Sequence, residues 1–232
     1  MSWMTSDIAL RVRSVARALG LTSLVMSGLR RLGYEVVLRG VVRRVIRPGD
    51  CVWDVGANRG LYTRMFGEKV GPDGTVVAFE PVPHTAERLR AAVADLPRVR
   101  TLPLALSDSS GDLAADLGDH PDAETARIFS AHAGEGDVMF RAERGDDLVR
   151  EGIVPRPQIV KIDVEGHELE VLQGMEEVLS NPSLRHLFIE VHFAILGMTD
   201  RQDVPTTIVR LLEAKGYRLR WVDQSHVWAA RA

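Results

Sequence analysis

From residue 50 onward, short apolar runs rich in Val and Ile alternate with stretches in which apolar residues recur at helical spacing. The expected strands are Val52–Val55, Thr75–Phe79, Val99–Leu106, Ile159–Ile162 and Leu184–Val191. The expected helices are Gly60–Val70, Thr85–Leu96, Glu168–Leu179 and Thr206–Lys215. Strands that alternate with helices predict an α/β fold of the Rossmann-like kind, with a mostly parallel sheet covered on both faces.

The end of the chain departs from the usual dinucleotide-binding pattern. Tyr217–Val222 and His226–Ala230 alternate between apolar and polar residues around Asp223-Gln224-Ser225, which predicts a β-hairpin. A mostly parallel, seven-stranded sheet that ends in an antiparallel hairpin is the layout of methyltransferases that use S-adenosylmethionine (SAM).

Two other segments lie outside the alternating pattern. Apolar residues recur with helical spacing from Thr5 to Leu32 and again from Tyr34 to Ile46, in an Arg-rich context. We expect residues 1–47 to form a helical segment that serves as a lid or as the contact of a homodimer, and residues 48–232 to form the main domain. Residues 109–147 are rich in Gly and Asp with weak periodicity, which indicates an insertion near the site.

Composition excludes some classes of protein and sets the compartment. The formal net charge of −3 gives no general reason to expect a nucleic-acid partner. Cys51 is the only cysteine, so the chain forms no internal disulfide, and its apolar neighbours place it in the core. The N-terminus lacks a signal-peptide pattern, and charges interrupt every long apolar run. We therefore expect a cytoplasmic protein without stable membrane insertion.

The motif that carries most chemistry is the turn Asp54-Val55-Gly56-Ala57-Asn58-Arg59-Gly60, between the first strand and the first helix of the domain. Gly56 and Gly60 allow a tight turn and a close approach of a ligand. A nicotinamide site requires G-x-G-x-x-G, and position 58 is Asn. The carboxylate of Asp54 repels a pyrophosphate but suits SAM, which carries an ammonium and a sulfonium.

Further polar residues follow the next two strands. Glu80 ends the second strand, twenty residues beyond Gly60, where a carboxylate can accept both hydroxyls of an adenosine ribose. Ser107 and Asp108 end the third strand and are expected at the adenine edge, although Ser-Asp is also an ordinary turn signal.

These motifs together resemble the FkbM family of SAM-dependent O-methyltransferases. The resemblance covers roughly Cys51 to His192 and rests on Asp54–Gly60, Phe79-Glu80-Pro81, Ala105–Asp108, Asp146-Asp147-Leu148 and Lys161–Glu168, the most specific block. It implies a class I methyltransferase fold and methyl transfer to a hydroxyl of a small acceptor, often a sugar or a secondary metabolite. The cofactor contacts that we expect are Asp54, Gly56, Asn58, Gly60, Glu80, Pro81, Ser107, Asp108 and Asp163.

Methylation of an alcohol needs a base or a metal ion, because the hydroxyl is a poor nucleophile until its proton leaves. Asp163 follows the fourth strand, and Glu165 and His167 come directly after it. His192 follows the fifth strand and is our first candidate for the general base, with His167 second. The alternative for each histidine is an ordinary hydrogen bond at the end of an element. If a magnesium-like ion is present, its expected ligands are Asp163, Glu190 and His192.

The sequence also bears on three other functions. An NAD-dependent oxidoreductase or sugar-nucleotide enzyme is disfavoured, because G-x-G-x-x-G and a Tyr-x-x-x-Lys pair are absent. A nucleic-acid methyltransferase has support only from the Arg-rich N-terminal segment. A non-catalytic protein with the same fold is disfavoured because competent residues fill the cofactor positions. Lys161 precedes Asp163 by two positions, so we expect it to pair with Asp163 or Glu80 and to support the site.

Overall fold

The computed structural model describes residues 38–116, 127–130 and 138–231. The chain divides into two compact units, Met1–Val41 and Val42–Ala232, and the second contains every element discussed below. The helices predicted between Thr5 and Leu32 lie outside the described residues, so the part played by the N-terminal segment stays a prediction. Residues 38–45 are helical. No described helix is both long enough and apolar enough to cross a membrane.

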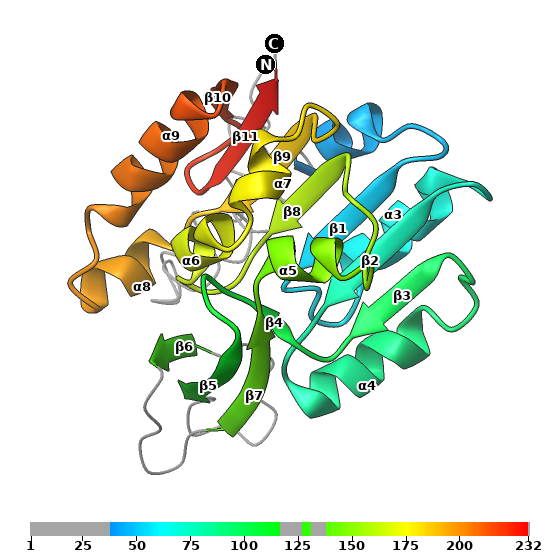
Figure 1. Cartoon of the computed structure of the whole chain (residues 1–232), viewed down its shortest axis with the longest axis horizontal. Coiled ribbons are helices and arrows are strands. Elements are labelled where there is room, and N and C mark those ends of the chain that lie inside the picture. Colours follow the sequence, from blue (N-terminus) through cyan, green and yellow to red (C-terminus); the bar gives the residue numbers. More distant parts are fainter. Residues whose placement is uncertain (1–37, 117–126, 131–137, 232) are drawn as a thin grey trace, which may run out of the picture. The chain divides into compact units, whose positions relative to one another are not determined.

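The second unit is organised around a seven-stranded sheet with the order β10-β11-β9-β8-β1-β2-β3 (Figure 1). Its strands are β1 (Cys51–Val55), β2 (Thr75–Phe79), β3 (Val99–Leu102), β8 (Ile159–Ile162), β9 (His186–Glu190), β10 (Tyr217–Trp221) and β11 (His226–Arg231). All neighbours pair in parallel except β11, which is antiparallel to both β9 and β10. The predicted fold, a mostly parallel sheet that ends in an antiparallel hairpin, is confirmed.

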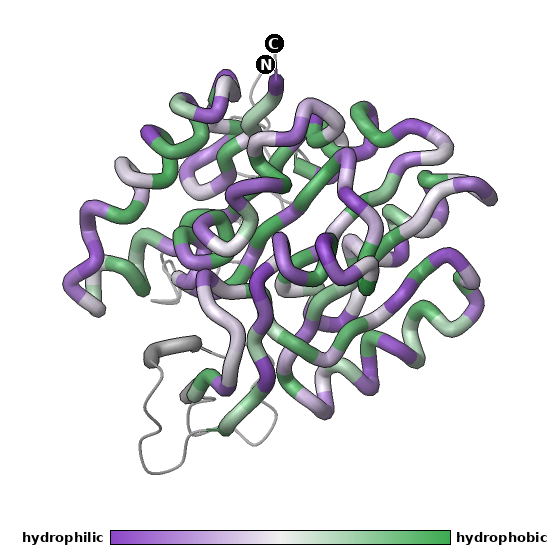
Figure 2. The backbone as a smooth tube through the Cα atoms, in the orientation of Figure 1, coloured by the Kyte–Doolittle hydropathy of each residue, from purple (hydrophilic) through white to green (hydrophobic). Residues whose placement is uncertain are grey.

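Helices connect the strands and cover the sheet. They are α3 (Leu61–Val70), α4 (Pro83–Ala92), α5 (Gly145–Arg150), α6 (Glu168–Gln173), α7 (Glu176–Ser180), α8 (Phe193–Met198) and α9 (Val204–Ala214). Helices α5 and α7 lie in front of the sheet in Figure 1, and α3 packs against β1 and β2. Every residue of β1 and β8 is buried, and Figure 2 shows how hydrophobic residues gather along these central strands. Cys51 lies in this core, and burial raises the pKa of its thiol to about 12, as expected of an inert cysteine.

The strand predicted at Val99–Leu106 is wrong in one respect, because the chain leaves the large sheet in its middle. The segment divides into β3 and β4 (Ala105–Leu106), which belong to different sheets. Pro103 stands at the break and has no N–H for a ladder hydrogen bond. Because β4 follows the carboxyl end of β3, the second sheet is attached at the edge of the large sheet where ligands bind in open α/β folds.

The segment at 109–147, predicted as an insertion of weak periodicity, contains regular structure. It provides β5 (Gly111–Asp116), β6 (Arg127–Ser130) and β7 (Val138–Glu143) of a four-stranded sheet with the order β4-β7-β5-β6. A small core of Ala105, Leu113, Phe140 and Ala142 holds this sheet together. The alternation in β7 is short and lies between polar residues, so the sequence alone did not indicate a second sheet.

The single helix predicted at Glu168–Leu179 is two helices, α6 and α7, that meet at Gly174 and Met175. A Cβ atom on Gly174 would lie 1.8 Å from the carbonyl oxygen of Ser107, so the end of β4 presses against the helix break. Asp146 fixes the second helix, since its carboxylate accepts hydrogen bonds from the N–H groups of Glu177 (3.0 Å) and Val178 (3.0 Å). Two distant segments, α5 and the Ser107 turn, therefore meet at this break.

Candidate active site

The glycine turn after β1 has the tight geometry that its sequence predicts. Gly56, Asn58 and Gly60 all have positive φ angles, of 74°, 49° and 84°. A Cβ atom on Gly56 would lie 1.8 Å from the carbonyl oxygen of Asp163, so only glycine fits there. The turn is therefore pressed against the end of β8, and the two motifs form one site.

Glu80, at the end of β2, faces this turn. Its Oε2 accepts a hydrogen bond from the N–H of Asn58 (2.9 Å), and its Oε1 accepts one from the N–H of Val82 (3.0 Å). Burial raises the pKa of Glu80 to about 7, although both hydrogen bonds favour the carboxylate. Each oxygen keeps a second lone pair, so the carboxylate can still accept the hydroxyls of a ribose. This arrangement fits the nucleoside part of SAM.

Asp54 is the buried acidic residue at which the glycine turn begins. The residue is fully buried, its Oδ2 accepts a hydrogen bond from Thr63 Oγ1 (2.6 Å), and its Oδ1 lies 3.4 Å from Nζ of Lys161. Burial raises the pKa of Asp54, and the charge of Lys161 opposes that shift. These contacts give Asp54 a structural part in the turn, and its direct contact with a cofactor stays a prediction.

Lys161 joins the cofactor turn to the acidic residue after β8. Its buried Nζ donates a hydrogen bond to the carbonyl oxygen of Gly56 (3.1 Å) and lies 3.2 Å from Oδ2 of Asp163. Burial opposes the charge on the lysine, but the carboxylates of Asp163 and Asp54 outweigh it and raise the pKa of Lys161. Of the two partners that the sequence suggested, the structure shows Asp163 and adds Asp54.

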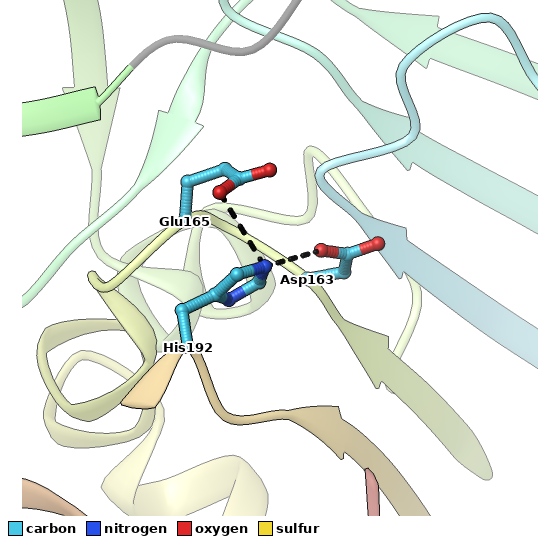
Figure 3. Close-up of side chains that lie close together, drawn as sticks. All are labelled: Asp163, Glu165 and His192. Atoms are coloured by element: carbon cyan, nitrogen blue, oxygen red, sulfur yellow. Dashed lines mark ion pairs between the residues drawn. The ribbon is translucent and has the colours of Figure 1, made fainter. Parts of the chain in front are cut away.

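His192 lies among carboxylates. It faces Oδ1 of Asp163, whereas Lys161 faces Oδ2 of the same residue. Figure 3 shows that its Nε2 points toward both acidic side chains of the β8 loop, 3.6 Å from Oδ1 of Asp163 and 3.5 Å from Oε2 of Glu165. Its Nδ1 lies 2.7 Å from Oε1 of Glu168, a buried carboxylate at the start of α6. Glu168 therefore fixes the ring so that Nε2 faces the site.

These carboxylates change the protonation of His192. Burial lowers the pKa of an imidazole, but the hydrogen bond to Glu168 and the charges of Glu168, Glu165 and Asp163 outweigh it and raise the pKa of His192 to about 9. At neutral pH the imidazole in this environment keeps its proton. It can act as a base only where another positive charge offsets the neighbouring carboxylates.

The structure groups different metal-binding candidates from those expected. In the part of the chain that the structure describes, Asp163, Glu165 and His192 each offer one ligand atom, and these atoms lie within 4.8 Å of one another. Glu190, expected in this set in place of Glu165, has its Oε2 3.2 Å from Nε2 of His226. β9 ends at Glu190, and His192 follows it directly before α8, in agreement with its expected place after the fifth strand.

The second candidate base, His167, lies apart from this group. Its Nε2 is 2.9 Å from Oγ of Ser107, and its Nδ1 is 3.6 Å from Oε2 of Glu170. Burial is the main reason why its pKa is lowered. Because the histidine is buried among these partners, it connects α6 to the Ser107–Asp108 turn. Asp108 is exposed beside Ser107, and Pro81 follows Glu80, but no observed contact tests either as a cofactor ligand.

The sequence did not predict that Glu168 would bind Nδ1 of His192 or that His226 would pair with Glu190. Glu168 appears in a helical pattern, where an acidic residue in the first turn is ordinary. His226 begins β11, and its Nδ1 lies 2.9 Å from Oδ2 of Asp223 in the hairpin turn. The expected hairpin at Asp223-Gln224-Ser225 was a signal for its position, but its pairing with Glu190 depends on the strand order.

Comparison with known proteins identifies the family. The model of the "Methyltransferase FkbM domain" matches residues 54–219, which include the glycine turn, Glu80 and the His192 group. This chain belongs to the FkbM methyltransferase family.

Hexuronic acid methyltransferase AglP of Haloferax volcanii is 38% identical over 164 residues, covering 70% of this chain and 64% of AglP. The 31-O-demethyl-FK506 methyltransferase FkbM of Streptomyces tacrolimicus is 33% identical over 176 residues, covering 63% of this chain and 67% of that protein. The chain thus spans about two thirds of the length of these curated relatives.

A solved structure agrees with the fold assignment. Precorrin-6y C5,15-methyltransferase of Geobacter metallireducens aligns over 84% of this chain and 87% of its own, with a TM-score of 0.50 and 14% identity. At that identity the likeness concerns the fold alone. The predicted family and the class I methyltransferase fold of this FkbM-family chain are therefore confirmed, and no relative supports the oxidoreductase alternative.

Proposed function

We propose that this protein transfers a methyl group from SAM to a hydroxyl of a small acceptor, a sugar or glycoside or a related natural product. The observation that carries the proposal is a continuous line of contacts across the carboxyl edge of the sheet. It runs from the carbonyl of Gly56 through Lys161 to Asp163 (3.1 and 3.2 Å) and on to His192 (3.6 Å). The cofactor turn and the candidate base are thus held together.

The relatives support this reading of the substrate class. AglP is named for a hexuronic acid and FkbM for an O-demethyl natural product, so both names describe small acceptors. The motifs that this chain shares with the family lie within the matched residues 54–219. We extend their substrate class to this chain, while its N-terminal segment remains a proposed lid or homodimer contact.

Glu80 and the glycine turn contribute separately to cofactor binding. Glu80 binds the ribose hydroxyls through the lone pairs that its two backbone hydrogen bonds leave free. The turn from Gly56 to Gly60 follows β1 at the carboxyl edge, where open α/β sheets bind their ligands. When bound, SAM supplies an electrophilic methyl group on a positively charged sulfur.

The acceptor residues align a hydroxyl and remove its proton. Nε2 of His192 is the atom that takes the proton, and Glu168 stabilises the ring through Nδ1. Asp163 and Glu165 hold the acceptor by accepting hydrogen bonds from neighbouring hydroxyls. A positive charge beside these carboxylates lowers the pKa of His192 from about 9 toward neutrality, which frees its Nε2 to act as a base.

The proposal includes a divalent cation bound at the acceptor side of the site. The ligand atoms of Asp163, Glu165 and His192 lie within 4.8 Å of one another, and two of these three ligands are the hard oxygens that magnesium prefers. A cation there would take Nε2 of His192 as a ligand and would bind the acceptor hydroxyls, so it would be an alternative to proton removal by His192. This part of the proposal rests on the geometry of the three side chains.

The experiment that tests the proposal is a methyl-transfer assay with SAM and a panel of glycosides, read by mass spectrometry. Product heavier by one methylene group would support the O-methyltransferase function. The assay is run with magnesium and with a chelator, and loss of turnover only in the chelator supports the cation. Absence of transfer to every acceptor, together with failure to bind SAM, would contradict the proposed function.

A further inference from the structure

Two large aromatic side chains are exposed together beside the candidate site. Phe193 and Trp221 expose 45% and 42% of their surface, although the domain buries most of its large apolar residues. Their ring centroids are 5.7 Å apart with an angle of 36° between the planes. Neither ring belongs to the buried core, and neither takes part in the proton transfer described above. The exposure of this aromatic pair therefore needs another explanation.

Strand order places this aromatic pair at the reacting edge of the sheet. β11 is antiparallel to both β9 and β10, so β10 runs in the same direction as β9 and its last residue, Trp221, lies at the same edge as the end of β9. Phe193 directly follows His192 and begins α8. The two rings therefore lie together at this edge of the sheet, and Phe193 directly follows the candidate base. Phe193 and Trp221 are 28 positions apart in the sequence, so the fold and not a local turn brings them together.

Each aromatic residue is next in the chain to a residue that is, or hydrogen-bonds to, a histidine paired with a carboxylate. His192, the neighbour of Phe193, has Nε2 3.5 Å from Oε2 of Glu165. The N–H of Val222, the residue after Trp221, donates to the carbonyl of His226, whose ring lies 3.2 Å from Oε2 of Glu190. The edge of the sheet that carries the two aromatic rings thus also carries hydrogen-bond acceptors.

This combination matches the chemistry of one class of ligand. A pyranose ring has a face of C–H groups and an edge of hydroxyls. The negative face of an aromatic ring attracts polarised C–H groups, and carboxylates accept hydrogen bonds from vicinal hydroxyls. We propose that Phe193 and Trp221 form a platform on which a pyranose ring of the acceptor stacks beside His192. This inference rests on the proposed function and names the residues that select its substrate.

A nucleobase is the principal competitor, because bases also stack on aromatic side chains. The acidic groups at the same edge of the sheet, Asp163, Glu165 and Glu190, oppose it, since they repel the phosphates that accompany a base. A purely apolar ligand would cover these charged groups without offering them a hydrogen bond. The charge at the edge of the platform therefore favours an uncharged, hydroxyl-rich ring.

The test is saturation-transfer NMR on the full chain with a panel of methyl pyranosides of the gluco, galacto, manno and xylo series. D-mannitol is the comparison ligand, because it offers vicinal hydroxyls without a ring face, and adenosine monophosphate tests the nucleobase. The variants are Trp221→Ala and Phe193→Ala. Met198→Ala is the control, since Met198 lies on the same helix as Phe193 and exposes 69% of its surface. All four proteins should show the same thermal unfolding transition, because these side chains are exposed.

The platform predicts saturation transfer to the ring C–H protons of at least one pyranoside, reduced threefold or more in both aromatic variants and unchanged in Met198→Ala. Equal transfer to mannitol, stronger transfer to adenosine monophosphate, no transfer to any pyranoside, or unchanged signals in both aromatic variants would each overturn it. SAM binding, measured separately by calorimetry, distinguishes the two proposals. A protein that binds SAM but shows no pyranoside effect loses only the platform, and one that binds pyranosides but not SAM loses the methyltransferase function.

Discussion

The ammonium group of Lys161 lies 3.2 Å from Oδ2 of Asp163, in a position where only 6% of the lysine side chain is exposed. Asp54, on the neighbouring strand β1, lies 3.4 Å from the same ammonium and is completely buried. One lysine therefore compensates two acidic groups that belong to different motifs. Its position explains how a turn that follows β1 and a carboxylate that follows β8 keep a fixed geometry.

Replacement of this lysine should destabilise the domain. Lys161→Met leaves the buried carboxylate of Asp54 without its cation, and the free energy of unfolding should fall by about 3 kcal/mol, as measured by urea denaturation. The double variant Asp54→Asn/Lys161→Met removes the buried charge as well and should recover a large part of that loss. If the single variant lost less than about 1 kcal/mol, Lys161 would not hold the site together.

Glu80 should make stability and cofactor binding respond to pH in opposite directions. Its pKa is raised to about 7 in the fold, above the ordinary 4.5, so the folded state binds more protons than the unfolded state between these values. The wild type should therefore lose stability as pH rises from 4.5 to 7, by an amount on the order of 3 kcal/mol that Glu80→Gln does not lose. Denaturant unfolding at several pH values measures this difference.

SAM affinity should rise as the pH passes through the raised pKa of Glu80, about 7, because the ionised carboxylate is the better acceptor for ribose hydroxyls. Calorimetric titrations of the wild type between pH 6 and 8 should give a falling dissociation constant, and Glu80→Gln should bind weakly at every pH. The same dissociation constant at both ends of the range would be evidence against Glu80 as the ribose ligand.

His192 should be required for turnover but not for cofactor binding. His192→Gln removes the base, and kcat should fall by about 100-fold or more while SAM still binds. The control is His186→Gln, because His186 begins β9, the strand after which His192 lies, and is therefore at the opposite edge of the sheet. A large loss of SAM binding in His192→Gln would move this residue from the acceptor side to the cofactor side.

Gly174 should not tolerate alanine, because its Cβ would lie 1.8 Å from a backbone oxygen of Ser107. We expect Gly174→Ala to lower the free energy of unfolding by about 3 kcal/mol, at the upper end of ordinary single substitutions. Gly197→Ala is the matched control, since no atom lies within 4 Å of its added Cβ and the residue lies in α8. That variant should gain up to about 1 kcal/mol from helix propensity. Equal stability of both variants would contradict the close contact at the helix break.

Local patterns in the sequence were sufficient for most of the large sheet. Alternating apolar runs indicated its strands, and the turn with Gly56 and Gly60 indicated where a ligand binds, because both signals depend on neighbouring residues. The second sheet was missed, since β5, β6 and β7 are short and pair across a segment with weak alternation. The break at Gly174 was missed for a similar reason, because it depends on Ser107, which lies far away in the chain.

In the site, too, local signals were predictable from the sequence, whereas contacts between distant segments were not. Asp163, Glu165 and His192 were identified from their places after two strands, and the structure brings them together. Glu190 was assigned to this group by the same reasoning, but its pairing with His226 depends on β11 lying next to β9. The raised pKa of His192 also depends on Glu168, whose helical position gave no indication of that contact.

The most direct test of the account is isothermal titration calorimetry of the purified protein with SAM, beside NAD. The variants are Glu80→Ala and, as a matched control, Glu87→Ala, because Glu87 is an exposed glutamate on α4. The account predicts SAM binding in the micromolar range, unchanged in Glu87→Ala and weakened about tenfold or more in Glu80→Ala, with no comparable binding of NAD. Absence of SAM binding, or tight binding of NAD, would contradict the assignment of the cofactor site.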